Sequence, residues 1–413
     1  MSHHLPQPEL ADQIGGLAEL RAHVSGVCFK HGPPSRTGVE LEWLLYDPGD
    51  PYRYPDVAGL RKILGKHTPR TLDPDSPADP LPHQGLVTVE PGGQIEISSA
   101  PSASVADLIA SMSADINYLT ALLEPSGFAL SNVAADPYRR PRRLLRTPRY
   151  DAMADSFDEI GPAGCVMMCC TAATQVCIDL GDAHQAAARW RAAHQLGPTL
   201  LAAFANSPRT AGDIPDVAST RMSSWWQLDP ARTMPPTSLD PQAYLDRVLT
   251  TPVLARYRDA QSWRLETSMT LLDWLASGQP LSTADVDLHL SMLFPPVRPQ
   301  GYLELRYLDA QPAGEWIAPL ALISALFADD ETVGQVIEAT ASGANRWQQA
   351  TEAGLADEVL CRTAGDLWAI AEPRLDALML PEDIAGRIAA LSRRRLGDAI
   401  SPATDQLSRE GSS

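Results

Sequence analysis

The sequence predicts an α+β fold, in which an antiparallel β-sheet carries helices packed on one side. Short apolar strands are scattered among helices without a regular strand–helix–strand alternation, which argues against a parallel sheet. No segment repeats along the chain, so a solenoid or propeller is excluded. From about residue 313 to residue 395, apolar residues recur only at helical spacing.

The first half of the chain contains most of the predicted strands. Apolar residues at helical spacing predict helices over roughly 12–25 and 103–127, and the second helix ends at Pro-Ser-Gly. A short helix near 58–64 lies within an excursion rich in Pro, Asp and Gly at 48–84. Apolar runs predict strands at 37–47, 86–90, 94–98 and 128–137, and a strand-like region over 166–181.

The second half is predicted to be mainly helical. A helix over 182–206 is expected to break at Gly197-Pro198. Residues 207–233 have the composition of a long loop, and residues 240–280 look helical. A proline-broken turn followed by a strand is predicted within 286–312.

Length and composition indicate a globular protein. The chain has 413 residues, 44% of them hydrophobic and 20% charged, which is enough for a large core. We expect a single domain over 1–413, with an N-terminal extension at 1–36, C-terminal helices at 313–395 and a flexible tail at 396–413.

Charge and cysteine usage exclude several classes of partner. A formal net charge of −18 argues against binding to nucleic acid or to an anionic membrane. No apolar run approaches the ~20 residues of a membrane span, and no secretory signal is present, so we expect a cytoplasmic protein. The six cysteines form no C-x-x-C pair and are expected to be buried and reduced. Lysine occurs only at positions 30, 62 and 66, so phosphate contacts would fall to arginine or metal.

Pairs of polar residues two apart in apolar strands are the first sign of chemistry. Glu40 and Glu42 in GVELEWLL share one face of a strand. Two glutamates side by side in a core strand are costly unless they are paired or bind metal, and we favour metal binding.

The segment TVEPGGQIEIS also brings acidic and amide side chains together in an apolar context. Gln94 and Glu96 share a face, and Glu90 precedes the Pro-Gly-Gly bend. Carboxylates converging on one surface repel each other unless a cation lies between them. The alternative is an ordinary solvated sheet face, with polar residues outside and apolar residues inside.

Two later strands repeat the pattern. Glu304 and Arg306 in GYLELRYLD share a face, although by themselves they are more typical of an internal salt bridge. Gln175, Cys177 and Asp179 in ATQVCIDL also alternate, and alone they are typical of a sheet face of mixed polarity.

Taken together, these strands predict a site for divalent cations. Carboxylate and amide oxygens suit Mg²⁺ or Mn²⁺, and several acidic ligands could hold two or three ions. Such ions with arginines nearby are suited to polyphosphate binding and phosphoryl transfer. Neither a P-loop nor a G-x-S-x-G nucleophile motif is present.

Several segments run in the order of a known family and cover about residues 37–312. They are GVELEW, TVEPGGQIEIS, PRYDAM, GPAGCVMMCCTAATQVCIDL, FANSP followed by STRMSSWWQLDPAR, and HLSMLFPPVRPQGYLELRYLDAQP. With these segments the sequence resembles the glutamate–cysteine ligases of the plant and bacterial type. More narrowly, it is similar to the actinobacterial branch that feeds ergothioneine biosynthesis. The plant proteins have Asn where this chain has Cys177.

The resemblance implies a fold and a reaction. The fold is similar to glutamine synthetase, with a curved antiparallel sheet that forms an active-site funnel surrounded by helices, and the single domain is then the catalytic domain. The expected reaction uses ATP to phosphorylate the γ-carboxylate of L-glutamate, and the amine of L-cysteine attacks the γ-glutamyl phosphate. The products are γ-glutamylcysteine, ADP and phosphate. The expected partners are these small molecules alone, and we expect a monomer.

The resemblance also implies residue roles. Arg306 is expected to face the ATP phosphates and, with Glu96, to serve catalysis. Gln175 is expected to contact metal or nucleotide. The expected metal ligands are Glu40, Glu42, Glu90, Glu96 and Glu304, and the expected substrate contacts are Arg149, Thr171, Arg221, Trp225 and Trp226. Which of the two tryptophans points into the pocket stays open, and core packing is the alternative for the pair.

Other functions stay open from the residues alone. The nearest is another carboxylate–amine ligase on the same scaffold with a different amine acceptor. A catalytically silent metal- or nucleotide-binding module and a metal-dependent phosphohydrolase are further alternatives.

Overall fold

A computed structural model of the protein describes residues 12–32, 36–211, 217–257, 262–265, 267–312 and 314–396. In this part of the chain, six strands form one antiparallel sheet in the order β3-β4-β1-β6-β8-β7. The strands are β1 Thr37–Trp43, β3 Leu86–Val89, β4 Ile95–Ser98, β6 Ala173–Ile178, β7 Val297–Pro299 and β8 Leu303–Asp309. The strands β2 Leu45–Tyr46 and β5 Ala129–Leu130 form a separate pair. The predicted α+β class is therefore confirmed.

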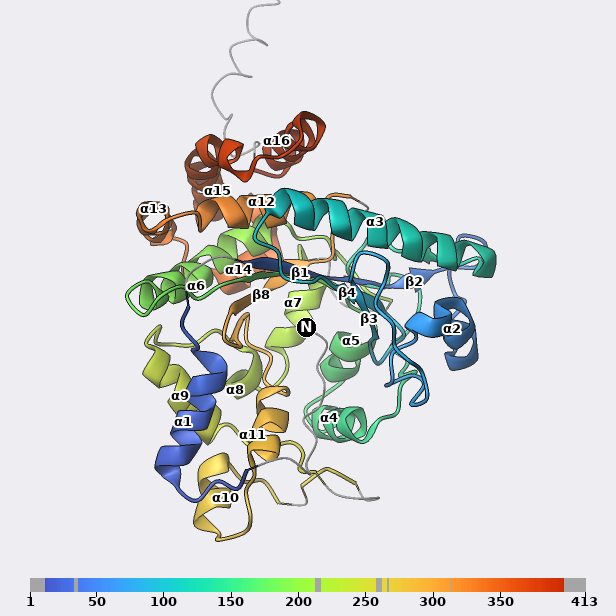
Figure 1. Ribbon diagram of the computed structural model, residues 1–413, viewed down its shortest axis with the longest axis vertical. Helices are drawn as coiled ribbons and strands as arrows, with labels where there is room; N and C mark the ends of the chain where they lie inside the picture. Colours follow the sequence, from blue (N-terminus) through green and yellow to red (C-terminus); the bar gives the residue numbers. More distant parts are fainter. Residues whose placement is uncertain are drawn as a thin grey trace, which may run out of the picture.

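Helices lie on both sides of the sheet (Figure 1). On the upper side, α3 Val105–Leu123, α6 Ala186–Ala203 and α12 Ile317–Leu326 contact β1, β8 and β6, respectively. On the lower side lie α4 Pro148–Asp158, α5 Ala163–Cys169 and α7 Thr220–Trp226. The prediction from periodicity that helices pack on one side only was wrong, because these three helices stand over the other face.

The remaining helices lie in the upper layer, at the lower end of the molecule and, for α2, at the right-hand edge beside β2 and β3 (Figure 1). The upper group is α13 Asp330–Thr340, α14 Trp347–Ala353, α15 Glu358–Ala371 and α16 Glu382–Leu396. The others are α1 Leu17–Cys28, α2 Val57–Leu64, α8 Pro230–Thr233, α9 Pro241–Thr250, α10 Leu271–Ala276 and α11 Thr283–Leu290. None of the helices in the described ranges is both long and apolar enough to cross a membrane.

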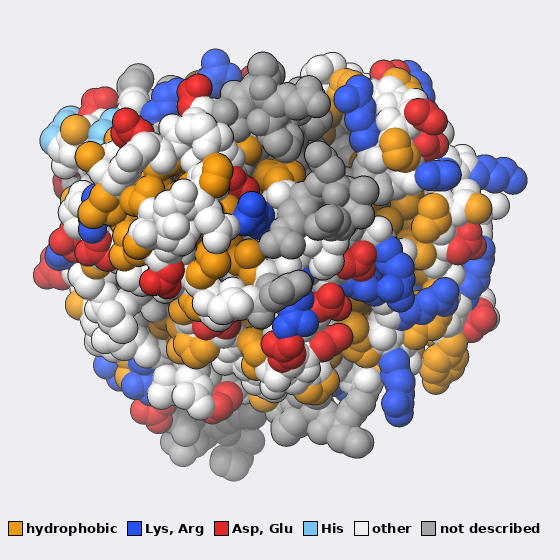
Figure 2. Space-filling model, turned by 90° about the horizontal axis from the view of Figure 1, so that it is seen from below, with side chains coloured by type: hydrophobic (Ala, Val, Ile, Leu, Met, Phe, Trp, Pro, Cys, Tyr) orange, Lys and Arg blue, Asp and Glu red, His pale blue; other side chains and the backbone are white. Residues whose placement is uncertain are grey.

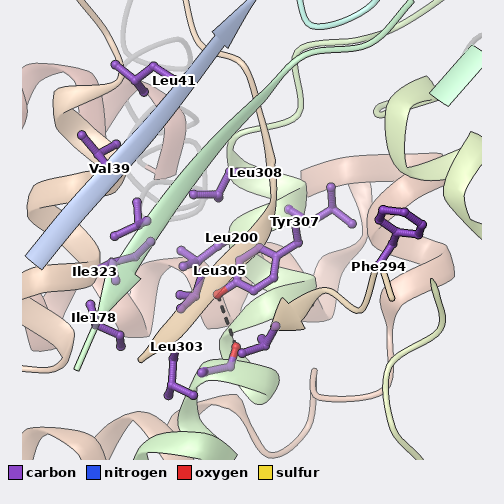
Figure 3. Packing of buried hydrophobic residues seen from close by; sticks show 14 of the residues in the cluster. Val39, Leu41, Ile178, Leu200, Phe294, Leu303, Leu305, Tyr307, Leu308 and Ile323 are labelled. Carbon is purple, nitrogen blue, oxygen red and sulfur yellow. Dashed lines mark hydrogen bonds between the residues drawn. The ribbon is translucent and has the colours of Figure 1, made fainter. Parts of the chain in front are cut away.

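The upper face of the sheet is the apolar one. Its side chains point toward α6 and α12, and the hydroxyl of Tyr307 donates a hydrogen bond to the carbonyl oxygen of Ala193 at 3.3 Å (Figure 3). Full burial of a large apolar side chain contributes about 1.5–3 kcal/mol, so this layer fixes which way the sheet faces. The buried members labelled in Figure 3 include Val39, Leu41, Ile178, Leu303 and Leu305 on the strands and Leu200 and Ile323 on the helices.

The lower face collects the polar residues of neighbouring strands. Glu40 lies opposite Ser98 on β4 and Gln175 on β6, and Glu42 lies opposite Glu96. Because side chains alternate along a strand, the opposite partners share this face. The outer strands continue the pattern with the pairs Thr88–Glu96, Cys177–Glu304 and Arg298–Glu304.

Two local predictions were wrong. The strand-like region at 166–181 divides into the end of α5 and strand β6, because a short apolar run fits a buried helix as well as a strand. The helix α6 continues through Pro198 without a break. Its neighbour Gly197 lies against the indole of Trp347, where an added Cβ would come within 1.9 Å of the ring, so tertiary packing decides this segment.

Three further regions differ from their predicted character. Residues 138–163, for which the sequence analysis predicted no helix or strand, contain α4, whose first turn is capped by Thr147 accepting a hydrogen bond from the Tyr150 amide. The loop-like segment 207–233 contains α7 and α8, and the helices that the structure describes within 240–280 are α9 and α10, near its two ends. The predicted tail from residue 397 onward, and residues 1–11 of the extension, lie outside the described residues. The single domain stays a prediction.

Candidate active site

A cavity of about 360 Å³ opens on the polar face of the sheet. This volume is within the range of small-molecule sites. Its floor comes from β1, β4 and β6, and its wall includes residues of α4, α5 and α7. The predicted site residues that line this cavity are Glu40, Glu42, Glu90, Glu96, Arg149, Thr171, Gln175, Arg221, Trp225 and Arg306.

Neutral groups hold the carboxylates on the floor. The Gln175 amide nitrogen donates to Glu42 at 2.9 Å, and the Ala173 backbone amide donates to the other oxygen of Glu42 at 2.8 Å. The Thr88 hydroxyl donates to Glu96 at 2.5 Å, and Gln175 reaches the second Glu96 oxygen at 3.5 Å. These contacts orient the carboxylates without neutralising them.

The floor therefore has an excess of negative charge. Burial, followed by repulsion from neighbouring carboxylates, raises the pKa of Glu40 to about 7, that of Glu96 to about 7 and that of Glu90 to about 8. Burial also raises the pKa of Glu42, against the attraction of Arg221. Carboxylates in such surroundings either keep a proton or bind a cation.

The donor atoms of the floor fit a hard divalent cation. The side-chain oxygen of Gln175 is buried without a hydrogen-bond partner, so this acceptor is available to a cation. Carboxylate and amide oxygens are the ligands that Mg²⁺ and Mn²⁺ prefer. In the described ranges, however, no three His, Cys, Asp or Glu side chains converge closely enough to enclose a metal ion. The metal-ligand roles of the five glutamates stay predictions.

Glu304 differs from the other glutamates because arginines surround it. Arg298 holds its carboxylate with two hydrogen bonds, at 2.5 and 2.9 Å, and Arg306 donates a third. Glu304 is completely buried and is absent from the cavity lining. The salt bridge between Glu304 and Arg306, which the sequence left open, is confirmed.

Arg298 was missed by the sequence analysis, although it lines the cavity. It lies directly opposite Glu304 in the β7–β8 hairpin. The signal was available: opposite charges on either side of the Gln300-Gly301 turn are the expected cross-strand pair of a short hairpin.

Two guanidinium groups share one aromatic ring at the cavity wall. Arg221 lies 4.9 Å and Arg306 5.5 Å from the ring centroid of Trp225. Arg221 also donates to the backbone carbonyl of Arg306 at 2.7 Å, and the Nε of Arg306 is buried without a hydrogen-bond partner. Paired guanidinium groups with N–H donors to spare are suited to carboxylate or phosphate oxygens.

The α4 side of the cavity holds another arginine, Arg149, apart from the pair Arg221 and Arg306. Arg149 is anchored by donating to the carbonyl oxygen of Ser291 at 2.8 Å, and it attracts the carboxylate of Glu90. Tyr150, which the sequence analysis missed, lines the same corner, and burial raises its pKa so that the hydroxyl stays protonated. Thr171 also lines the cavity, but its hydroxyl donates to the carbonyl oxygen of Met167 at 2.9 Å.

Trp226 lies away from the cavity. Its indole nitrogen donates to the hydroxyl of Thr351 at 2.8 Å, and its ring packs against Trp347 at a centroid distance of 6.0 Å. Trp226 is therefore not brought to the cavity, and of the two adjacent tryptophans only Trp225 lines it. Consecutive helical residues diverge by about 100°, so only Trp225 of this pair faces the site.

The Pro-Gly-Gly bend fits closely against α5. Gln94 donates to the carbonyl oxygen of Thr171 at 2.9 Å and accepts from the Gly92 amide at 2.9 Å, so its side chain ties the bend to the end of α5. A Cβ at Gly92 would come within 2.2 Å of the Cys169 carbonyl oxygen, and Gly93 has a φ of 92°. Glycine is required at both positions by contact and by conformation.

The apolar wall was also missed. Met153 on α4, Met168 on α5 and Phe294 line the cavity beside Trp225. Phe294 packs edge-on against Trp225 at 6.4 Å. Helical periodicity marks such residues as core, and only the packing of the helices shows that they border a cavity.

The lower surface of the molecule, opposite α16, carries both basic and acidic side chains (Figure 2). Figure 2 views the face opposite α16, where basic side chains gather toward one side and acidic and apolar ones intersperse with them. All six cysteines are free, and Cys28, Cys169 and Cys170 are buried as predicted.

Comparisons with known proteins show the family to which the chain belongs. The sequence model of glutamate–cysteine ligase family 2 matches residues 36–409. The glutamate–cysteine ligase EgtA of Mycobacterium tuberculosis is 35% identical over 379 residues, which are 88% of this chain and 84% of that protein. The chloroplastic glutamate–cysteine ligase of Arabidopsis thaliana is 30% identical over 340 residues, 78% of this chain and 65% of that protein.

A solved structure shows the same fold. The glutamate–cysteine ligase of Francisella tularensis, in complex with AMP, superposes with a TM-score of 0.52 at 12% identity. The match covers 93% of this chain and 86% of that chain.

Proposed function

Because the chain belongs to glutamate–cysteine ligase family 2, we propose that it joins the γ-carboxylate of L-glutamate to the amine of L-cysteine in an ATP-dependent reaction. ATP transfers its γ-phosphoryl group to the glutamate carboxylate, and ADP leaves. The cysteine nitrogen then attacks the acyl carbon, phosphate departs, and the amine loses a proton. The product is γ-glutamylcysteine.

One observation carries this proposal. The same cavity holds a floor of carboxylates with too little positive charge and a wall where two guanidinium groups lie over one indole. The floor would hold Mg²⁺ or Mn²⁺ through Glu40, Glu42 and Glu96, and a bound cation would neutralise phosphate charge. The wall would receive the anionic substrate groups.

The side chains act by positioning and electrostatics. Arg306 would face the transferring phosphoryl group, where its partnerless Nε can donate to an oxygen. Arg221 and Arg149, anchored on different walls, would hold the glutamate carboxylates. The reaction needs no side-chain nucleophile, because the glutamate carboxylate and the cysteine amine are the nucleophiles.

We place the product in ergothioneine biosynthesis, as the actinobacterial branch implies. The similarity to EgtA supports this assignment.

The test is ADP release with Mg²⁺, ATP and glutamate, with and without cysteine. Wild type should require cysteine, and Glu96→Ala should be inactive. Glu338→Ala, an exposed glutamate on α13, is the matched control and should keep wild-type activity. Equal ATP hydrolysis without cysteine would contradict the proposal and favour a phosphohydrolase. Faster turnover with another amine would favour a different ligase on the same scaffold.

A further inference from the structure

A buried carboxylate at the end of β8 connects the sheet to the cavity wall. Asp309 is completely buried and has no part in the cavity lining. Its Oδ2 accepts hydrogen bonds from the Asn206 amide at 2.8 Å and the Ser207 hydroxyl at 2.6 Å. Its Oδ1 accepts one from the Ser219 hydroxyl at 2.9 Å.

These contacts fix the start of α7. Ser219 is the N-cap of α7 and accepts a hydrogen bond from the Met222 amide. The Ser207 hydroxyl accepts one from the Arg221 amide at 3.1 Å. Asp309 therefore holds, through two hydroxyl groups, the helix turn that carries Arg221.

The same carboxylate also attracts the Arg221 side chain directly. The Oδ1 of Asp309 lies 3.8 Å from Nη1 of Arg221, and both side chains are at most 2% exposed. The guanidinium is further restrained by the Arg306 carbonyl and the Trp225 ring. A guanidinium has five N–H donors, so these contacts leave donors for the cavity that Arg221 lines.

We propose that Asp309 is a positioning residue that orients Arg221 to bind a carboxylate of glutamate. The proposal rests on the proposed ligase function, in which Arg221 contacts glutamate. Asp309 itself does not contact substrate. Its buried negative charge and its hydroxyl partners select one orientation of the Arg221 guanidinium before glutamate arrives, and this lowers the ordering cost of binding.

The test is a double-mutant cycle between Asp309→Asn and Arg221→Ala. Asn keeps the shape of the side chain but loses the charge that faces Arg221. We expect Asp309→Asn to raise the KM for glutamate at least ten-fold, with a smaller change in kcat and an unchanged KM for ATP. In the Arg221→Ala background, the same substitution should change the KM for glutamate less than two-fold.

Asp115→Asn is the matched control. Asp115 is also completely buried and accepts from two backbone amides, of His83 and Gly85, but it lies on α3. The substitution Asp115→Asn should lower the melting temperature of the protein and leave the KM for glutamate unchanged. Ser219→Ala removes one hydrogen bond to Asp309 together with the N-cap of α7, and we expect it to raise the KM for glutamate about three-fold. It tests the same network with a second variant, so the result does not depend on the folding of Asp309→Asn alone.

Isothermal titration with L-glutamate separates the two proposals, because it needs no turnover. Loss of glutamate affinity in Asp309→Asn supports the positioning role even if wild type shows no cysteine-dependent ADP release, which would refute the ligase function alone. The positioning role is overturned if glutamate binds Asp309→Asn as it binds wild type. It is equally overturned if the two substitutions have multiplicative effects, or if the KM for ATP rises in place of that for glutamate.

Discussion

The buried glutamates at the two ends of the polar sheet face have different partners: arginines at one end and neutral hydrogen-bond donors at the other. On β8, Glu304 is held by Arg298 and Arg306, so its charge is compensated within the protein. On β1 and β4, Glu42 and Glu96 receive hydrogen bonds from neutral groups, namely the Ala173 amide and the side chains of Gln175 and Thr88. The β8 end is therefore balanced in charge by its own arginines, whereas the β1–β4 end keeps an excess of negative charge.

This difference separates two roles for the same residue type. A compensated carboxylate anchors the arginines that border the cavity. Uncompensated carboxylates create a site for a cation, at a cost in stability when that cation is missing. Substitutions at the two ends should therefore affect activity alike and stability differently.

The largest expected effect contrasts Glu96→Gln with Glu304→Gln. Both should reduce cysteine-dependent ADP release by about 100-fold or more, because each disturbs the charges around the reacting phosphoryl group. Only Glu304→Gln should lower the free energy of unfolding, by about 3–5 kcal/mol, since it leaves two buried arginines without their partner. Urea denaturation without metal measures this, and equal destabilisation by both would remove the distinction.

The arginine side of the compensated end gives a second prediction. Arg298→Ala should destabilise the protein by about 3 kcal/mol, because Glu304 stays buried with one arginine fewer. The control is Arg394→Ala, which removes a surface pair with Glu315 and should cost less than about 1 kcal/mol. A similar loss in both variants would show that burial of the pair is unimportant.

The uncompensated end should respond to metal and pH. The pKa values of Glu96 and Glu90 are raised in the folded state, to about 7 and 8, above the ordinary value of 4.5. The folded protein then binds protons that the unfolded chain releases, and in a chelator its stability falls as pH rises through this range.

Mg²⁺ bound by these carboxylates would take the place of those protons. We expect Mg²⁺ to stabilise the protein by about 2–3 kcal/mol at 100 times its dissociation constant, and to raise the melting temperature more at pH 8.5 than at pH 6.5. Thermal melts with Mg²⁺ or a chelator at the two pH values measure it. An equal gain at both would mean that the carboxylates are not the binding groups.

The smallest expected effect separates the two adjacent tryptophans. Trp225→Leu removes the ring under Arg221 and Arg306, worth about 1–2 kcal/mol, and should lower kcat/KM for glutamate about ten-fold. Trp226→Leu should leave kcat/KM within about two-fold of wild type, since Trp226 packs behind α7 against Trp347. Steady-state kinetics measures kcat/KM for glutamate in the two variants. Equal reductions in Trp225→Leu and Trp226→Leu would contradict the placement of Trp225 at the cavity.

Much of the polar face could be predicted because strand alternation is a local rule. Residues two apart share a face, so the pair Glu40 and Glu42 and the pair Glu304 and Arg306 were identified correctly as facing together. What they do depends on the neighbouring strand. The register that puts Arg298 beside Glu304, and Gln175 between Glu42 and Glu96, is a property of the assembled sheet.

The sequence by itself determined the secondary-structure class, the carboxylate-bearing strands and the absence of lysine from the site. These follow from composition and from periodicities of two and 3.6 residues, which act over a few positions. The tertiary structure alone decided that α5 is a helix, that Trp225 and not Trp226 reaches the cavity, and that Asp309 lies behind Arg221. Those outcomes depend on packing between segments far apart in the chain, where burial energy outweighs local preference.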